Sequence, residues 1–464
     1  MKKSKNMAAM ADTHAQWSSS WVFVLAVSGA AIGLNNVWQF PFLVSDYGGG
    51  AFIIVYLFCV LLIGVPLLIA EVMLGRWGRA SPVNSIRRLA EHVGRRPGWG
   101  AIGWLGVGAG FLILSYLSVI AGWIMAYAAR AAIGALDGLT AEGIGNLFTT
   151  FVADPEKQIL WHTLFIVMTM FVVGRGIKAG LEPVIKYSVP LLFVLLIGLL
   201  IYAATVGDLG QAAERLLYPD FTKLTRLGIL AAAGHAFFSL GLGVGAMLIY
   251  GAYLHDDASI PKLALVAAGL DTLAGVIGGL VVLSVVFAGG MEPVSRADLI
   301  FQALPMTFDQ LPLGRAMATL FFISLVIAAW LSGIALIEPL MAWLNENWGL
   351  SRARAAAICG LGAWLVGLTT VLSFNYWGFS FKIFGTVKRL GFFDLLQILT
   401  SDLLLPLSGL FMALFAGWLL TPELTRAELR MRSPCAYDLW LWSVRLIMPV
   451  LLFLVFFNAP SLFL

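Results

Sequence analysis

The residues best placed for chemistry lie between Ser28 and Gly50, inside the first long apolar segment of the chain. This stretch combines helix-loosening glycines with polar and cyclic residues, namely Gly29, Gly33, Asn35, Asn36, Pro41 and Gly48 to Gly50. Within hydrocarbon, an interrupted backbone is tolerated only where protein covers it or where it lines a cavity. We therefore predict an unwound hinge from Ile32 to Asn36 between two half-helices, and we expect the ligand site there.

A second apolar segment has the same character. The run from Gly234 to Gly245 contains Gly241, Gly243 and Gly245 at a spacing of two, which disfavours a firm helix. Interrupted segments at matching positions in two halves of a chain indicate inverted repeats with a binding site near the membrane midplane. The alternative is a pair of glycine-rich faces used for helix packing, since glycine is common in membrane helices.

Composition requires that these segments be positioned by membrane-spanning helices. The chain has 464 residues, of which 60% are hydrophobic and 12% charged, whereas soluble domains carry about 25% charged residues. Apolar runs predict eleven spans and an all-α integral membrane fold. The predicted spans are 18–45, 51–75, 101–129, 159–174, 184–206, 228–253, 262–289, 314–344, 354–375, 393–420 and 437–460. We expect a tail over residues 1–16, repeats over about 17–206 and 227–420, and an extra helix over about 437–460.

The distribution of lysine and arginine predicts the orientation. Basic residues gather in the tail and in the loops after spans 2, 4, 6, 8 and 10, which places the N-terminus in the cytoplasm and makes the chain a multi-pass protein of the inner (plasma) membrane. The net charge of +4 gives no indication of nucleic-acid binding. Cys59 and Cys359 fall inside apolar segments, where a buried small side chain is favoured over metal or redox chemistry.

The motifs resemble one family over nearly the whole chain. They are Trp17, the run Ala31-Ile32-Gly33-Leu34-x-Asn36-x-Trp38-x-Phe40-Pro41, Gly48-Gly49-Gly50-Ala51-Phe52, Pro66, Glu71, Gly75-Arg76 and Phe237-Phe238-Ser239-Leu240. Together they resemble the neurotransmitter:sodium symporters, in particular the bacterial eleven-span branch. The resemblance implies a 5+5 inverted-repeat, leucine-transporter-like fold with broken helices 1 and 6. It also implies Na⁺-coupled uptake of an amino acid or related small organic solute by alternating access.

The resemblance implies a first sodium site made of the Ala31 carbonyl, Asn36, Ser239 and Asp271. A carboxylate inside a span is a functional candidate in its own right, and Asp271 would supply formal charge where many relatives have asparagine. Tyr56, His235 and Ser239 occupy the family's chloride neighbourhood, but His235 stands where glutamine is usual. Chloride dependence is therefore left open.

The resemblance implies a second sodium site at the carbonyls of Gly29, Ile32 and Ala328 with hydroxyls from the eighth span. Here Ser332 supplies one hydroxyl, and Leu331 stands where the family usually has threonine. The loss of one oxygen ligand weakens this site, so the expectation is one or two bound Na⁺ ions.

The implied substrate pocket is mostly apolar and contains glycines that leave space. Its expected residues are Ala31, Gly33, Leu34, Asn35, Ile113, Leu117, Phe238, Ser239, Gly241, Val244, Ser332, Gly333 and Leu336. Family amino-acid carriers have a tyrosine at the position of Leu117, and here Tyr116 lies one residue earlier, about 100° round a helix. The carboxylate of an amino acid would lose one hydrogen bond as a result.

Two gates follow from the same resemblance. At the outer gate, Gln39 and Gln397 replace an arginine and an aspartate, and an amide pair could still close over Phe238. At the inner gate, His14 and Glu346 stand where an ion pair is usual, with Trp17 and Tyr253 beside them. Because a His–Glu pair requires protonated histidine, we expect higher cytoplasmic pH to favour inward opening.

Two other function classes remain to be weighed. A receptor-like homologue that binds solute without coupled transport is motivated by Leu117, Leu331 and the missing gate charges. An intramembrane enzyme has little support, because no span holds a His/Glu or Cys/His pattern with metal-ligand spacing.

Overall fold

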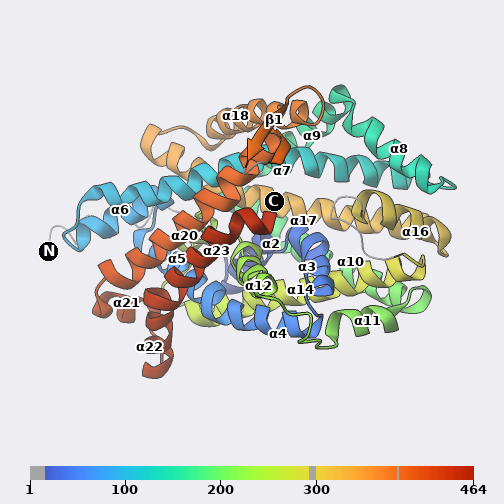
Figure 1. The fold of residues 1–464 in the computed structure, drawn as a ribbon. Coiled ribbons are helices and arrows are strands. Elements are labelled where there is room, and N and C mark those ends of the chain that lie inside the picture. The colour runs from blue at the N-terminus through green and yellow to red at the C-terminus, as the bar shows by residue number, and fades with distance from the viewer. Residues whose placement is uncertain (1–15, 292–298, 384–385, 464) are drawn as a thin grey trace.

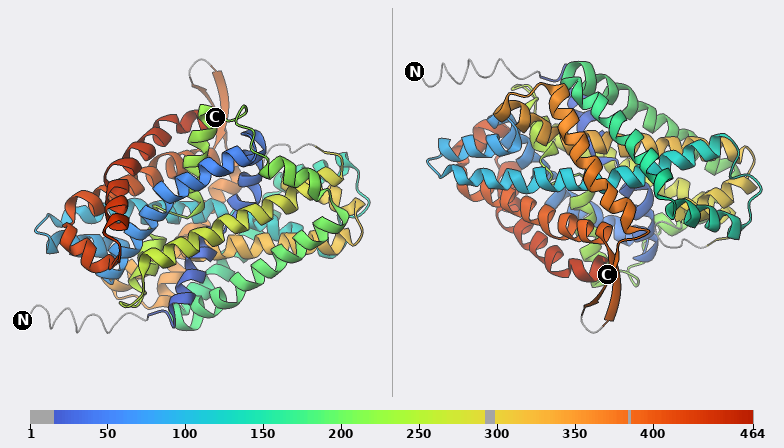
Figure 2. Two further views of the ribbon diagram at one scale, coloured as in Figure 1. Left: turned by 90° about the horizontal axis from the view of Figure 1, so that it is seen from below. Right: turned by 90° about the horizontal axis from the view of Figure 1, so that it is seen from above.

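The computed structural model describes residues 16–291, 299–383 and 386–463. Long helices run roughly side by side along the molecule, with α6, α21 and α22 at one end and α8, α11 and α16 at the other (Figure 1). The views from below and above show the same bundle with the hairpin of β1 and β2 projecting from it (Figure 2).

The long apolar helices correspond to the predicted spans. Over the described residues, nine helical stretches are long and apolar enough to cross a membrane, and a tenth span results if the bent pair α2 and α3 is counted as one. The helices of the first half are α2 (Ser20–Ala31), α3 (Leu34–Asp46), α4 (Gly50–Cys59), α5 (Val65–Gly78), α6 (Pro82–His92), α7 (Ala101–Ala132), α8 (Ala141–Val152), α9 (Pro155–Gly174), α10 (Glu182–Val206) and α11 (Leu209–Leu217).

The second half begins with another interrupted pair, α12 and α13, which the length criterion does not count. Its helices are α12 (Arg226–Ser239), α13 (Ala246–Ala252), α14 (Ile260–Ala288), α16 (Leu304–Gln310), α17 (Gly314–Trp348), α18 (Arg352–Ser373), α19 (Phe392–Gln397), α20 (Leu405–Leu414), α21 (Pro422–Leu429), α22 (Pro434–Trp442) and α23 (Met448–Phe463). Shorter helical turns continue several of them, namely η1 (Val60–Gly64), η2 (Pro97–Gly100), η3 (Ile177–Leu181), η4 (Leu299–Ala303), η5 (Ile398–Leu404), η6 (Phe415–Leu419) and η7 (Ser443–Ile447).

The fold is helical with one exception. Strands β1 (Gly378–Ile383) and β2 (Thr386–Gly391) pair antiparallel between α18 and α19. The all-α fold class is confirmed, and the hairpin is a local addition to it that the sequence analysis did not predict, because an apolar-run criterion finds spans and does not test the β-propensity of the segments that join them. The short helices α6, α8, α11, α16 and α21 also lie outside the predicted spans.

Glycines allow the helices nearest the interruptions to pack backbone against backbone. A Cβ on Gly75 of α5 would lie 1.7 Å from the Leu248 carbonyl oxygen of α13, and a Cβ on Gly251 would lie 2.4 Å from that of Val72. A Cβ on Gly110 of α7 would similarly lie 2.7 Å from the Leu336 carbonyl oxygen of α17. Small residues at such crossings are how membrane helices gain van der Waals contact.

Candidate binding site at the helix interruptions

The first interruption is shorter than predicted. Helix α2 ends at Ala31, Gly33 is extended, and α3 begins at Leu34, with the two helices bent by 59°. Asn35 and Asn36 thus lie in the first turn of α3, not in the unwound part. The side chain of Asn36 accounts for this, because its Oδ1 accepts a hydrogen bond from the Gly33 N–H at 3.3 Å and caps the helix start.

The second interruption covers residues 240–245, and its conformation depends on glycine. Gly241, Gly243 and Gly245 have φ of 60°, 83° and 79°, a region that L-residues with side chains rarely adopt. Gly243 is held from both sides: its N–H donates to Glu71 Oε1 at 2.7 Å, and its carbonyl accepts from Ser408 Oγ at 2.7 Å. The buried Glu71 therefore supports the interruption, and Ser408 is a support that the sequence reasoning did not identify.

The two interruptions meet each other and α17. Ser332 Oγ of α17 donates to the Ala30 carbonyl at 3.3 Å. A Cβ on Gly33 would lie 3.2 Å from that hydroxyl, and a Cβ on Gly241 would lie 3.7 Å from the Ala30 oxygen. Residues from three distant segments thus surround the end of α2, where helix C-termini present free carbonyls and partial negative charge.

A buried carboxylate lies beside this junction. Asp271 of α14 is fully buried, and both of its oxygens accept hydrogen bonds, from Asn36 Nδ2 at 2.8 Å and from Ser239 Oγ at 2.5 Å. Asn36 Nδ2 also donates to the Asp271 carbonyl at 3.1 Å. A carboxyl group that accepts at both oxygens fits the ionised form, which has no donor. Over the part of the chain that the structure describes, no lysine, arginine or histidine pairs with Asp271.

One residue named for the second sodium site, Gly29, is in contact with an apolar side chain. Leu331 is buried, and a Cβ on Gly29 would lie 3.4 Å from Leu331 Cδ1 and 3.6 Å from Cδ2. The side chain of Leu331 therefore covers the same turn of α2 whose carbonyls were expected to bind an ion. Ala328 is buried one turn earlier on α17, and Ile32 is buried at the interruption.

The predicted substrate residues divide by exposure. Gly33, Ile113, Leu117, Phe238, Gly241, Ser332 and Leu336 are partly exposed and Asn35 is exposed, whereas Ala31, Leu34, Ser239, Val244 and Gly333 are buried. Tyr116 is directed elsewhere, because its hydroxyl lies 3.3 Å from Thr400 Oγ1 and its ring meets Phe393 edge-on. Leu117 is therefore the residue of this turn that remains available to the predicted pocket.

The glutamines predicted for the outer gate are half-buried, and no hydrogen bond joins Gln39 to Gln397 in the described structure. At the other end of the molecule the N-terminal segment is docked. The Trp17 N–H donates to the Tyr253 carbonyl at 3.0 Å, and its indole N–H donates to the Tyr250 carbonyl at 3.1 Å. Trp17 is 1% exposed, so its side chain is enclosed by the helices at this end of the bundle.

The other residues predicted for the inner gate have partners that the sequence did not indicate. Glu346 accepts at 2.7 Å from the Ser81 N–H, from Ser81 Oγ and from Asn84 Nδ2 at the start of α6. His14 lies outside the described residues. The Tyr253 hydroxyl donates to Glu338 Oε1 at 2.8 Å, and Glu338 is also paired with Arg352 at 2.7 Å.

The expected chloride neighbourhood contains stacked rings. The ring of His235 lies 5.4 Å from those of Phe40 and Tyr56, centroid to centroid. The Tyr56 hydroxyl lies 3.5 Å from Thr272 Oγ1. These contacts account for the position of the imidazole ring, but its Nδ1 is buried without a hydrogen-bond partner among the described residues.

A cavity of about 300 Å³ lies apart from this site, between the end of α3 and α11. It is lined by Ser45, Gly48, Gly49, Gln211, Glu214, Arg215, Tyr218, Asp220 and Lys223. None of the predicted binding residues contributes to it.

Comparison with known proteins identifies the family. The profile of the Sodium:neurotransmitter symporter family matches residues 14–137 and 154–457. The chain therefore belongs to this family of sodium-dependent membrane transporters. The resemblance drawn from the motifs is confirmed.

Individual relatives agree over full length. An uncharacterised sodium-dependent transporter of Bacillus subtilis, YhdH, is 33% identical across 96% of this chain and 97% of its own length. One of Haemophilus influenzae is 28% identical across 95% and 97%. The crystal structure of MhsT in complex with L-phenylalanine matches with a TM-score of 0.86 and 38% identity, over 96% of this chain and all of that chain.

Proposed function

We propose that the protein is a Na⁺-coupled symporter that imports an amino acid or a related small organic solute by alternating access. The observation that carries this proposal is Asp271, a buried carboxylate with no cationic partner among the described residues. A buried charge is costly unless it is paired. Its neighbours are oxygen-bearing side chains and the end of an interrupted helix, which suit a small hard cation.

The proposed Na⁺ site consists of Asn36, Ser239, Asp271 and the Ala31 carbonyl. We propose one such ion per transport cycle. The contact of Leu331 with Gly29 supports this, because an apolar side chain lies where the second ion would require oxygens. Chloride has no role in the proposal, since Asp271 already supplies a negative charge.

The proposed solute site lies at Gly33, Phe238, Gly241 and Ser332, with Ile113 and Leu117 as its apolar wall. The start of α3 presents backbone N–H groups and partial positive charge to an anionic group. The complex of MhsT with L-phenylalanine supports an amino acid with an apolar side chain. Leu117 lacks a hydroxyl for the carboxylate, so we propose a wider range that includes amino acids without a strict need for the α-carboxylate.

The proposed architecture has eleven spans in two inverted repeats, with α2/α3 and α12/α13 as the two broken members. The N-terminus lies on the cytoplasmic side of the inner (plasma) membrane, and docked Trp17 closes the solute pathway on that side. Gln39 and Gln397 form the outer gate, and His14 and Glu346 contribute to the inner one.

Reconstitution tests this function. Purified protein in proteoliposomes should accumulate labelled phenylalanine or another solute against its gradient when an inward Na⁺ gradient is imposed, and should lose the accumulated solute when the gradient is dissipated with an ionophore. Solute binding without accumulation would instead favour a receptor-like homologue. A thermal-shift screen of amino acids, betaines, amines and taurine-like compounds, with and without Na⁺, selects the solute.

Substitution of Leu117 refines the solute class. Leu117→Tyr adds a hydroxyl that can donate to a carboxylate, a bond of about 1.5–3 kcal/mol to a charged group. We expect the preference for an amino acid over its decarboxylated analogue to rise about tenfold in Leu117→Tyr and to stay unchanged in Leu117→Phe. Equal preference in both variants would exclude this residue from carboxylate recognition.

A further inference from the structure

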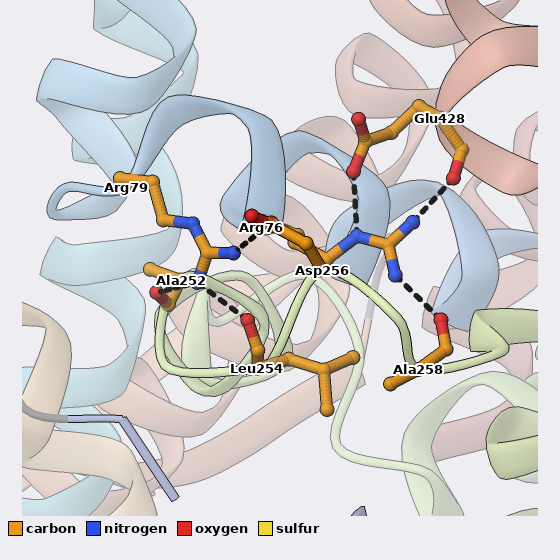
Figure 3. A network of polar contacts seen from close by, with 7 residues as sticks. All are labelled: Arg76, Arg79, Ala252, Leu254, Asp256, Ala258 and Glu428. Atoms are coloured by element: carbon orange, nitrogen blue, oxygen red, sulfur yellow. Dashed lines mark hydrogen bonds and ion pairs between the residues drawn. The ribbon is translucent and has the colours of Figure 1, made fainter. Parts of the chain in front are cut away.

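Two arginines near the end of α5 hold the segment that receives Trp17. Arg79 follows α5 and donates from Nη1 to the Ala252 carbonyl at 3.0 Å, and it also bonds the Leu254 carbonyl and the carboxylate of Asp256. Figure 3 shows this guanidinium between the three acceptors. The acceptors lie at the end of α13 and on the turn that follows it, so Arg79 fixes the course of residues 252–256.

Arg76 connects the same segment to a third element. Its Nε donates to Glu428 Oε1 at 2.5 Å, its Nη1 donates to the Ala258 carbonyl at 2.6 Å, and it also bonds the Glu428 carbonyl (Figure 3). The side chain of Arg76 is 2% exposed and that of Glu428 is 21% exposed. An ion pair with a buried guanidinium that donates three hydrogen bonds orients its elements more strictly than an exposed ion pair.

Arg79 has an unusual backbone conformation for a residue with a side chain. It ends α5 with φ of 47°, in the left-handed region. Glycine is the residue usually found there, because a Cβ makes that conformation unfavourable. From this position the guanidinium bonds residues 252–256, whereas Arg430, which ends α21 in the same conformation, has no side-chain bond among the described contacts.

The segment held by these arginines is the docking site of Trp17. The carbonyl groups of Tyr250 and Tyr253 accept from the Trp17 indole and backbone N–H, and His255 Nε2 lies 2.6 Å from the Trp17 carbonyl. Arg79 donates to the carbonyls of Ala252 and Leu254, which lie in the sequence between the residues that bond Trp17. Trp17 therefore docks on a segment whose neighbouring carbonyls are held by Arg79.

We propose that Arg76 and Arg79 are positioning residues for the cytoplasmic gate: they act through residues 250–258 to hold Trp17 docked and so set the balance between closed and open cytoplasmic states. This inference rests on the proposed transport function for its meaning, but the docking itself is measurable without transport. Moving Trp17 away requires only that its own bonds break while the turn keeps its shape. Loosening the turn weakens all of these bonds together.

Hydrogen–deuterium exchange on the full-length protein tests the docking. In Arg79→Gln, the amides of residues 16–19 and 250–258 should exchange about tenfold faster, the effect of losing one charge-assisted hydrogen bond. The amides of α7 should be unchanged. Arg79→Lys should recover part of the protection, because an ammonium can bond fewer of the three acceptors.

A matched pair on the neighbouring helices serves as control. Glu428→Gln removes the charge that faces Arg76 and should also speed exchange at residues 250–258. Asp438→Asn removes the partner of Arg426 in an exposed ion pair, in which the side chains of Arg426 and Asp438 are 57% and 54% exposed. This variant should have no effect on exchange.

A second measurement separates positioning from simple destabilisation. If Arg79→Gln increases the population of the state that is open to the cytoplasm, fewer molecules are in the cytoplasmically closed state that binds Na⁺. The Na⁺ concentration for half-maximal binding then rises in proportion to that loss. Unchanged exchange at residues 16–19 in Arg79→Gln, or equal acceleration in α7, would overturn the proposal. A failure of wild-type protein to accumulate solute would instead refute the proposed function and leave the exchange result standing.

Discussion

At the scale of single residues, two positions near the helix interruptions differ in opposite ways from the usual residues of the family. Asp271 introduces a formal charge among uncharged oxygens, whereas Leu331 introduces methyl groups against Gly29. The two substitutions act in opposite directions on cation binding. In the proposed function, they concentrate Na⁺ binding at the first of the two sites that the family resemblance implied.

The charge of Asp271 can be removed with little change of shape. In Asp271→Asn, Na⁺ loses a Coulombic attraction of several kcal/mol even at an effective dielectric constant of about 20. We expect the Na⁺ concentration for half-maximal stabilisation in a thermal-shift titration to rise at least about tenfold. Asp46→Asn, at an exposed position on α3, is the control and should leave the titration unchanged. Unaltered Na⁺ affinity in Asp271→Asn would remove this residue from the site.

Leu331 can be changed to restore an oxygen. Leu331→Ser places a hydroxyl against the carbonyls of α2, and we expect the Na⁺ dependence of uptake to change from a Hill coefficient near one to a value approaching two. Leu331→Ala, which creates space without an oxygen, should retain a coefficient near one. A wild-type coefficient near two would show that the second ion binds despite the leucine.

At the scale of elements, the half-helices are held by neighbours that approach very closely. Glu71 and Ser408 bond both polar groups of Gly243. Gly75 and Gly251 let α5 and α13 touch along their backbones. The interruptions are therefore fixed parts of the structure, supported from α5 and α20, and the bend between α2 and α3 is set by a cap from Asn36.

Gly75→Ala tests the contact between α5 and α13. The added Cβ would lie 1.7 Å from the Leu248 carbonyl oxygen, which is backbone and cannot rotate away. We expect the variant to lose about 2 kcal/mol or more of stability, measured as a lowered melting temperature in detergent. Gly108→Ala in α7 is the matched control: a Cβ there meets nothing within 4 Å, and alanine favours the helix. Equal melting temperatures for the two variants would contradict the close packing.

At the scale of the whole molecule, the two ends differ. The helices α6, α21 and α22 lie at one end, and α8, α11 and α16 lie at the opposite end (Figure 1). At the first end, Arg76 contacts Glu428 of α21, and Trp17 docks on the neighbouring segment through Tyr250 and Tyr253. The excess of arginine at the first end is the signal that predicts its cytoplasmic location.

A natural cysteine makes the orientation measurable. Cys435 is exposed on α22, whereas Cys59 and Cys359 are 6% and 2% exposed. We expect a membrane-impermeant maleimide to label the wild-type protein in inside-out vesicles and not in right-side-out vesicles. Cys435→Ser should abolish the labelling. Reaction from the outside of intact cells would reverse the proposed topology.

Much of the fold could be predicted from the sequence, because its signals are local. Apolar length identifies spans, and glycine at alternate positions identifies the interruption that the structure has at residues 240–245. The hinge at Ile32 was located correctly, but its length was overestimated. Asparagine in an apolar run suggests an unwound backbone, yet the side chain of Asn36 here caps the following helix.

The sequence by itself determined a membrane-spanning chain with two interrupted segments, an intramembrane carboxylate and a family relationship, since each of these depends on residue types at short spacing. The tertiary structure alone decided that Asp271 meets Asn36 across 235 residues, that Arg76 meets Glu428 across 352, and that Tyr116 faces Thr400. Such contacts depend on how helices rotate and cross. Helical periodicity leaves that choice open, and it is made by close packing at residues such as Gly75 and Gly110.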